Sequence, residues 1–397
     1  MTAVEWMFAG AVGFSGLAIV YHHALFPLYL KARARRPGQE EPGAEVTELP
    51  SMTVVVPAYN EETMIAGKVR NLSSLIYPAN KLSVVIACDG CRDETAVRAR
   101  LAASEPECRH LSIRVIEYAE NRGKVAVLNE VLGAVKTDLV CLTDASAWLS
   151  VDAFSRTARH FRAPDIGVVA GTYLLYRAGS AGEATYWRYQ RLVKQGEASL
   201  GAPLGVHGAC YVMRTSAVRL LPGDTINDDF ILPMQAVADG YRSVYDPTIL
   251  ALEMETSDIG MDFKRRCRIA AGNTQQVLRM ASLLHPRHGG VALAFASGKA
   301  LRITMPYMMA TCLMGCAALA PVSPLFLLLV SLQGLGYTLA VARPTILKSV
   351  RFRLLDVLHY IVTGHAANLV GSVRYLAGLE KGRWTKISSH TKIEVPQ

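Results

Sequence analysis

The chain has 397 residues, of which 51% are hydrophobic and 19% charged, and its formal charge at pH 7 is +9. The mean hydropathy of +0.22 is high for a soluble protein, and several membrane spans would account for it. The basic residues lie mainly beside apolar stretches, without zinc-finger spacing or an RNA-binding signature, so we expect lipid headgroups and diphosphates as partners and no nucleic acid.

The first apolar stretch runs from about Val4 to Leu30, and no Lys or Arg precedes it. It is longer than the apolar region of a secretory signal, and basic residues follow it instead of preceding it. The region 1–36 is therefore predicted to be a retained transmembrane helix with its C-terminal end and basic flank in the cytoplasm.

A segment rich in Pro, Gly and Glu, 37–50, reads as a linker. After it, short β-branched runs alternate with longer amphipathic stretches, and the predicted strands cover 52–57, 81–89, 111–118 and 137–144. Such alternation is typical of βαβ units. We therefore expect a cytoplasmic α/β domain over 51–285 with a mixed, mainly parallel sheet, and an interfacial helix at 260–282 within it.

The C-terminal part returns to an apolar texture. Residues 303–342 carry no charge and are long enough for two spans, with a turn at Pro321 to Pro324. The stretch 354–376 fits either a third span or an interfacial helix, and the sequence leaves that choice open. We expect interfacial and transmembrane helices over 286–380 and a basic cytoplasmic tail over 381–397.

Polar residues follow the first two predicted strands. Ala58, Tyr59 and Glu61 come after the first strand, and Asp89 ends the second. Ligands of open α/β sheets bind beyond the carboxyl ends of the strands, where a carboxylate and an aromatic ring can clasp a nucleobase. The alternative is an ordinary strand–turn–helix junction with a helix cap.

Two further motifs follow in the same order. Lys124 comes after Gly123 at a predicted helix start, which suits phosphate or metal-adjacent binding. Asp144 and Ser146 follow the fourth strand, where a carboxylate could hold a divalent cation that bridges two phosphates. Each motif is weak by itself, but four of them at successive strand ends predict one site.

The region after the fourth strand adds two motifs. Gly208 and Ala209 lie in a glycine-rich stretch that by itself fits a tight loop entering a strand. Asp228 and Asp229 open a helical stretch, where adjacent acids could act in proton transfer or could simply cap the helix.

Together these motifs resemble the family 2 glycosyltransferases of GT-A fold, and in particular the membrane-embedded branch with cellulose, chitin, hyaluronan and poly-N-acetylglucosamine synthases. The resemblance covers about Met52 to Asn273. It implies that a nucleotide-sugar is the donor. The residues implied to bind the donor are Ala58, Tyr59, Glu61, Asp89 and Lys124.

The resemblance also implies the roles of the later motifs. Asp144 and Ser146 occupy the D-x-D metal motif, with Ser in place of the second Asp, and imply Mg²⁺ or Mn²⁺ as cofactor. Gly208 and Ala209 would line the acceptor channel. Asp229 would be the catalytic base, with Asp228 beside it.

The last motif resembles the Q-x-x-R-W sequence of processive synthases. Arg265, Arg266 and Arg268 would neutralise the diphosphate of the donor. Ile269 stands at the position of the Trp that stacks on the acceptor sugar in those enzymes, which favours limited transfer over long-polymer synthesis.

We therefore expect an inverting enzyme in the inner or plasma membrane that moves a sugar from a UDP-sugar to a glycan or lipid-linked acceptor in extracellular polysaccharide or glycolipid synthesis. A processive synthase that couples polymerisation to export, with polysaccharide-assembly partners, is the alternative product class. A non-catalytic scaffold and a transporter are alternatives of other classes. The scaffold is disfavoured because four residues of the motifs, Asp89, Asp144, Asp229 and Arg268, are all present. The transporter is disfavoured because the apolar spans contain almost no internal charge.

Overall fold

The computed structural model describes residues 2–34, 48–177, 181–255, 259–350 and 352–380. Most of the predicted linker and the whole predicted tail over 381–397 lie outside these residues. The chain divides into a helical unit, Met1–Arg33 with Phe263–Glu380, and a sheet unit that contains residues 34–262. Each unit is described by itself.

The described residues of the sheet unit form a mixed sheet of eight strands in the order β3-β2-β1-β4-β7-β6-β8-β5. Pairing is parallel among β1, β2, β3 and β4 and between β6 and β8, and antiparallel at β7 and β5. The strands are β1 (Met52–Ala58), β2 (Leu82–Asp89), β3 (Ser112–Tyr118), β4 (Leu139–Leu142), β5 (Ala147–Leu149), β6 (Ile166–Leu175), β7 (Tyr211–Arg214) and β8 (Arg242–Glu253).

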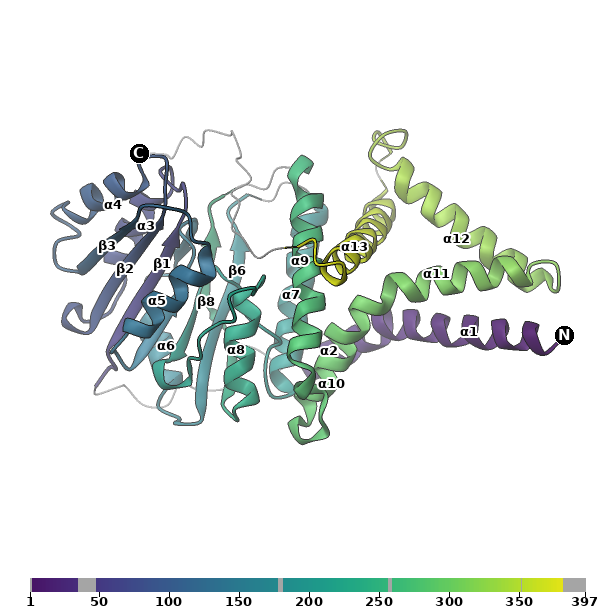
Figure 1. Cartoon of the computed structure of the whole chain (residues 1–397), viewed down its shortest axis with the longest axis horizontal. Helices are drawn as coiled ribbons and strands as arrows, with labels where there is room; N and C mark the ends of the chain where they lie inside the picture. The colour runs from purple at the N-terminus through teal and green to yellow at the C-terminus, as the bar shows by residue number, and fades with distance from the viewer. Residues whose placement is uncertain (1, 35–47, 178–180, 256–258, 351, 381–397) are drawn as a thin grey trace. The chain divides into compact units, whose positions relative to one another are not determined.

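Helices cover both faces of this sheet (Figure 1). Every residue of β1 is buried, as a central parallel strand requires. Val54 and Val56 face the cluster that includes Ile65 of α3, and the intervening Val55 is buried on the other face. The helices of the unit are α3 (Ile65–Ser73), α4 (Thr95–Ala103), α5 (Lys124–Ala134), α6 (Ala153–His160), α7 (Ala181–Ser199) and α8 (Asp228–Ala238). The carboxyl ends of β1, β2 and β4 therefore meet at one edge, as the strand pattern predicts.

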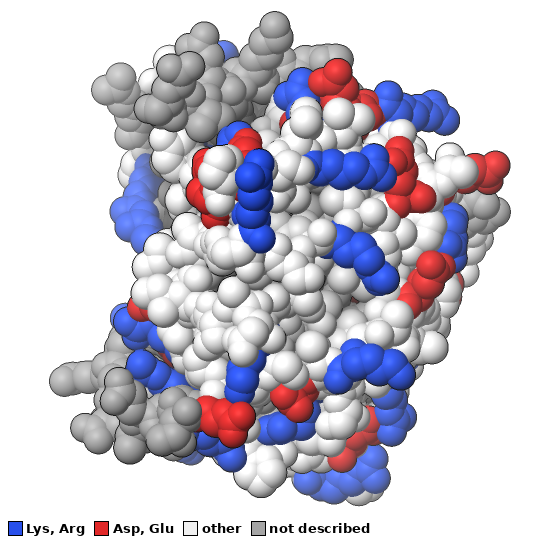
Figure 2. All heavy atoms as spheres, turned by 90° about the vertical axis from the view of Figure 1, so that its left-hand side faces the viewer, with Lys and Arg blue, Asp and Glu red and all other residues white. Residues whose placement is uncertain are grey.

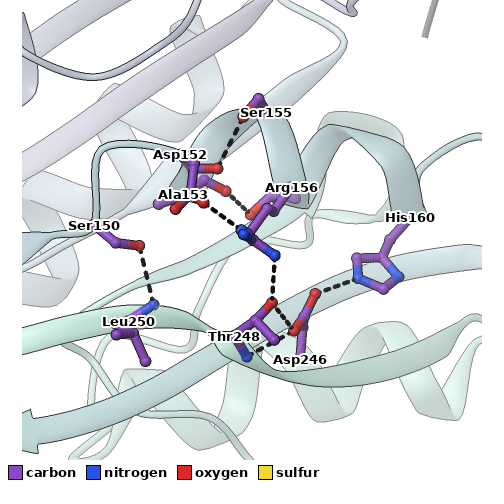
Figure 3. A network of polar contacts seen from close by, with 10 residues as sticks. Ser150, Asp152, Ala153, Ser155, Arg156, His160, Asp246, Thr248 and Leu250 are labelled. Carbon is purple, nitrogen blue, oxygen red and sulfur yellow. Dashed lines mark hydrogen bonds and ion pairs between the residues drawn. The ribbon is translucent and has the colours of Figure 1, made fainter. Parts of the chain in front are cut away.

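A polar network fastens α6 to β8 (Figure 3). Arg156 bonds Asp152 at 2.5 Å and reaches Thr248 Oγ1 at 3.3 Å, and His160 Nε2 lies 2.8 Å from Asp246 Oδ2. Burial alone would raise the pKa of Asp246, but the hydrogen bonds from His160 and Thr248 outweigh it and lower that pKa. The network holds α6 against β8, which with β5 forms the edge of the sheet opposite β3.

Charges of both signs alternate over the end of the sheet unit that holds α3, α4 and β3 (Figure 2). Arg98 pairs with Glu94 at 2.8 Å, and Arg100 pairs with Glu117 at 2.7 Å. Opposite charges this close cancel each other's field at a distance. The described residues of this face therefore form no continuous basic surface.

The helical unit begins with an uninterrupted helix made of α1 (Ala3–Val20), a π-helical segment (Tyr21–Leu25) and α2 (Phe26–Arg33). The later elements are α9 (Ile259–Arg279), α10 (Gly290–Ala294), a π-helical segment (Phe295–Ala300), α11 (Leu301–Leu319), α12 (Pro324–Ala342) and α13 (Arg353–Leu376). Short 3₁₀ turns at Ala281–Leu284 and Pro286–His288 follow α9, and two others, Ala79–Lys81 and Thr215–Ala217, lie in the sheet unit.

Small residues allow close helix packing within this unit. A Cβ at Gly315 of α11 would lie 2.5 Å from Val12 Cγ2 of α1, and one at Gly371 of α13 would lie 2.4 Å from the Cys267 carbonyl oxygen of α9. Because α9 packs here, its residues from Phe263 on belong to the helical unit. The predicted interfacial helix at 260–282 is present as α9, but from Phe263 on it groups with the other helices and not with the sheet domain in which it was expected.

Among the described residues, two helices are long and apolar enough to cross a membrane, Ala3–Arg33 and Pro324–Ala342. Only 11% and 6% of their most apolar windows are buried, whereas the core helix of a soluble protein would be mostly buried. These two helices suggest membrane association. The predicted turn at Pro321 to Pro324 does separate α11 from α12, and 354–376 forms one helix, α13.

Candidate active site

The loops after β1 and β2 are bonded to each other. The backbone N–H of Glu61 donates to Thr95 Oγ1 at 2.7 Å, and that of Arg92 donates to Asn60 Oδ1 at 2.8 Å. Asn60 adopts a left-handed backbone with φ 56°, which Asn tolerates better than most residues. The predicted donor residues Ala58, Tyr59 and Glu61 thus lie in one braced turn, in which Ala58 is buried and the other two are partly exposed.

Asp89, at the end of β2, is fully buried, and it holds the loop between β3 and α5. Its two carboxylate oxygens accept the backbone N–H groups of Arg122 and Gly123, each at 2.8 Å. Gly90 follows with φ +63°, and a Cβ there would lie 2.3 Å from the backbone nitrogen of Asn121. The sequence predicted donor contact for Asp89; in the structure its carboxylate shapes the turn that leads into Lys124.

Lys124 lies between two carboxylates from distant parts of the chain. Its Nζ is 3.3 Å from Asp144 Oδ1 and 3.2 Å from Asp228 Oδ2. Lys124 opens α5, Asp144 follows β4 and Asp228 opens α8. The structure therefore brings together three residues that the sequence had assigned to donor, metal and catalytic roles.

Electrostatics within this cluster oppose burial. Burial alone would lower the pKa of Lys124, but the carboxylates of Asp144, Asp228 and Asp229 outweigh it and raise that pKa. Burial alone would raise the pKa of Asp144, but the charges of Lys124 and His207 outweigh it and lower that pKa. Lys124 is thus held cationic and Asp144 anionic at neutral pH.

The loop before β7 closes on this cluster. Val206 donates its backbone N–H to the Asp229 carbonyl oxygen at 3.0 Å, which ties the loop to the start of α8. A Cβ at Gly208 would lie 2.9 Å from Asp144 Oδ2. The predicted acceptor residue Gly208 and the predicted metal ligand Asp144 are therefore neighbours.

Gly208→Ala should displace the Asp144 carboxylate without unfolding the domain, because the added methyl meets the movable end of a side chain. We expect a loss of transfer of about 10²-fold, the cost of misplacing a reacting group by about 1 Å. Gly133→Ala is the matched control, since a Cβ there meets nothing within 4 Å. Steady-state rates of both variants test this, and wild-type activity of Gly208→Ala would contradict it.

His207 belongs to an aromatic group that the sequence analysis did not assign. Its ring stacks on Tyr173 with centroids 3.6 Å apart and an interplanar angle of 18°. Trp187 of α7 meets His207 edge-on at 5.1 Å. The sequence shows that His207 lies next to Gly208, but the neighbouring residues do not predict that β6 and α7 supply the aromatic rings that contact it.

Glu253, at the end of β8, is an acidic residue near the site that was not predicted from the sequence. It pairs with Ala147 across the β5–β8 ladder, and Met254 donates its backbone N–H to the Ser146 carbonyl oxygen at 3.0 Å. Burial, together with the nearby charge of Asp144, raises the pKa of Glu253 to about 7, although a hydrogen bond with Ser146 opposes the shift. No motif marks this residue, because its place depends on antiparallel pairing between distant segments.

Glu253→Gln should flatten the pH dependence of stability. The raised pKa means that the contribution of Glu253 to stability is complete below about pH 4.5 and is lost as pH rises through about 7. By pH 8 the loss is about 3 kcal/mol. In EDTA, we expect Glu253→Gln to melt several degrees above wild type at pH 8 and close to it at pH 5. The same difference in melting temperature between variant and wild type at both pH values would contradict this. Glu94→Gln, at an exposed site, is the control.

Asp144 and Ser146 supply oxygen atoms, the donor type that Mg²⁺ and Mn²⁺ prefer. Among the described residues, no group of three or more His, Cys, Asp or Glu side chains forms a ready-made metal cage. This fits a cation that takes its remaining ligands from phosphates and water, as Mg²⁺ usually does. The ionised Asp144 would be the principal protein ligand, and the Ser146 hydroxyl, which hydrogen-bonds Glu253, is the second predicted one.

The predicted diphosphate-binding arginines lie on α9 in the helical unit. Arg265 and Arg268 are exposed, and the guanidinium of Arg266 lies 4.2 Å from the ring centroid of Tyr360 on α13. Ala209, the second predicted acceptor residue, is fully buried, and its carbonyl oxygen accepts from Thr143 Oγ1 at 2.6 Å.

The fold and this acidic cluster define a class of enzyme, the GT-A glycosyltransferases. Residues 50–272 match the family model described as "Glycosyltransferase like family 2". Because the match covers more than half of the chain, the protein belongs to glycosyltransferase family 2. The predicted fold class and enzyme class are therefore confirmed.

Curated relatives agree with this assignment. The chain is 26% identical over 259 residues to a poly-beta-1,6-N-acetyl-D-glucosamine synthase of Staphylococcus aureus, covering 63% of this chain and 61% of the relative. It is 23% identical over 252 residues to an N-acetylglucosaminyltransferase of Rhizobium leguminosarum bv. viciae, covering 59% and 58%. The chain thus spans about three fifths of the length of the curated relatives that it matches.

A solved structure shares the fold. It is a mannosyltransferase from Pyrobaculum calidifontis in complex with GDP-Man and Mn²⁺, with a TM-score of 0.72 and 21% identity. The alignment covers 93% of this chain and all of that one.

Proposed function

We propose that the protein is an inverting glycosyltransferase that adds a single sugar from a UDP-sugar to a membrane-associated glycan or lipid-linked acceptor, without polymerising it. The observation that carries the proposal is the bridge from Lys124 to Asp144 and Asp228, which gathers a cation and acids at the carboxyl edge of the sheet. The names of the curated relatives support a sugar donor of the N-acetylglucosamine type.

In the proposed reaction, Asp229 accepts the proton of the acceptor hydroxyl as its oxygen attacks the anomeric carbon. The bond from that carbon to the diphosphate oxygen breaks, and UDP leaves with the bonding electrons. Lys124 provides positive charge beside the leaving diphosphate. A divalent cation at Asp144 and Ser146 would supply further charge neutralisation there.

The apolar helices support a proposal about the membrane. We propose that Ala3–Arg33 and Pro324–Ala342 span the membrane, with α11 beside them, and that the sheet unit is cytoplasmic. The apolar windows of the first two are almost wholly exposed, and Lys31 and Arg33 end the first. From the resemblance, we propose that Arg265, Arg266 and Arg268 of α9 bind diphosphate or lipid headgroups, both of which are anionic.

A processive synthase is the second candidate, because the Staphylococcus aureus relative is named as a polymer synthase. Ile269 speaks against it, since this exposed aliphatic side chain cannot stack on an acceptor sugar as an aromatic ring does. Product length separates the two candidates. Long product ladders would favour the synthase.

A donor panel tests the proposed function. Membranes containing the full chain are incubated with Mn²⁺ and several UDP-sugars, with GDP-mannose as a comparison arm, and nucleoside diphosphate release and product size are measured. We expect release from one UDP-sugar and a product extended by one or a few sugars. Release from GDP-mannose alone would contradict the donor assignment.

A further inference from the structure

We propose that the buried ammonium group of Lys68 is a positioning device for the Asp144–Ser146 turn, which it holds by hydrogen bonds to the residues on either side of that turn. The inference rests on the proposed function, because it assigns that turn to the metal and donor site. It concerns a residue that touches neither donor nor acceptor in the proposed reaction.

Lys68 lies on α3 with its whole side chain buried. It shares the apolar face of that helix with Ile65, Val69 and Leu72. An apolar residue of similar length could fill this space, and replacing buried charges by apolar groups is often neutral or stabilising. A charged group at such a buried position therefore points to a specific role of that group.

The hydrogen bonds of Lys68 identify that role. Its Nζ donates to Thr143 Oγ1 at 2.7 Å, and it also donates to the carbonyl oxygen of Ala147. Thr143 immediately precedes Asp144, and Ala147 immediately follows Ser146. One ammonium group therefore fixes both ends of the turn that carries the predicted metal ligands.

The same chain of bonds reaches the acceptor loop. Thr143 Oγ1 accepts from Lys68 and donates its own proton to the Ala209 carbonyl oxygen at 2.6 Å. Ala209 follows Gly208, which packs directly against the Asp144 carboxylate. Lys68 thus couples α3, the metal-ligand turn and the acceptor loop within the sheet unit.

Electrostatics are consistent with this position. Burial lowers the pKa of Lys68 to about 8, while nearby thiols and the carboxylates of Asp144 and Glu253 oppose the shift. The ammonium form therefore still predominates at pH 7. The positive charge also favours the anionic form of Asp144, which contributes to the low pKa of that carboxyl.

The experiment measures Mn²⁺ binding to the full chain in detergent with UDP present, by the electron paramagnetic resonance signal of free Mn²⁺. Lys68→Met keeps the length of the side chain and removes its donors. We expect Mn²⁺ affinity to fall about 10- to 100-fold, the usual effect of removing a group that orients a metal ligand. Lys68→Gln keeps a donor and should recover part of the loss.

Lys136→Met, at an exposed position outside the site, is the matched control and should bind Mn²⁺ as wild type does. A folded Lys68→Met protein with wild-type Mn²⁺ affinity would overturn the proposal, because a purely structural lysine would change only the melting temperature. If Lys68→Met does not fold, Thr143→Val removes the next link of the same chain with little change of volume. Wild-type Mn²⁺ affinity in that variant would overturn the proposal equally.

The outcome is separable from that of the proposed function. Lys68-dependent Mn²⁺ binding without sugar transfer from any donor would support the positioning role and count against the proposed reaction. Sugar transfer with a Lys68→Met variant that behaves as wild type would reject the positioning role alone. A wild-type chain that binds no Mn²⁺ with UDP present would overturn both.

Discussion

Replacing Asp229 by Asn is expected to abolish sugar transfer and to leave donor binding intact. Asn keeps the shape of the side chain but cannot accept the proton of the acceptor hydroxyl, and general-base catalysis typically contributes about 10²- to 10⁴-fold. We expect a loss of turnover within that range. Turnover with the donor that the panel identifies and a UDP titration measure the two properties separately.

The neighbouring acid provides an internal comparison. Asp228 forms an ion pair with Lys124 at 3.2 Å, so Asp228→Asn should act mainly on donor binding through that lysine. Asp239→Asn, at the other end of the same helix and paired with Arg219, should have little effect. Full turnover in Asp229→Asn, or an equal loss in all three variants, would remove Asp229 from the role of base.

The second large effect is expected for Asp144→Asn. The substitution removes the ionised oxygen ligand of the turn and one of the two carboxylates that hold Lys124. We expect Mn²⁺ affinity to fall by about 10²-fold or more, because charged oxygen ligands dominate the binding of hard divalent cations. Transfer should fall by about 10³-fold, since the leaving diphosphate then loses its neutralising charge.

Asp165→Asn is the control for this variant. Asp165 is exposed and paired with Arg242 at 2.5 Å, and it belongs to none of the strand-end motifs. Both Mn²⁺ binding and transfer should stay at wild-type levels in that control. If Asp144→Asn retained wild-type Mn²⁺ affinity with UDP present, the cation would have to bind elsewhere.

The first half of the sheet was predictable because its signals are local. β1, β2, β3 and β4 are short β-branched runs separated by helices, and parallel pairing follows from that alternation. The short strand β5 and its pairing with β8 were not predictable. Its partner lies about a hundred residues away, and no turn signal links the two.

The candidate site divides in the same way. The meeting of Lys124 and Asp144 follows from the rule that the carboxyl ends of parallel strands share an edge. Asp228, at the start of α8, was expected at the site only from the family resemblance. Lys68 was not predicted because it lies among apolar residues of one helical face, where core residues are expected. Glu253 was not predicted because its place depends on the pairing of β5 with β8. A lysine among Ile65, Val69 and Leu72 on one helical face was nevertheless a signal that could have been pursued.

Asp144 is proposed to bind the cation that accompanies a nucleotide-sugar. The most direct measurement is an experimental structure of the full chain with UDP and Mn²⁺, in which anomalous scattering locates the manganese. We predict a manganese peak within about 2.0–2.6 Å of an Asp144 carboxylate oxygen, with the UDP diphosphate as a further ligand. Bound UDP with manganese at a site that does not include Asp144 would contradict the account.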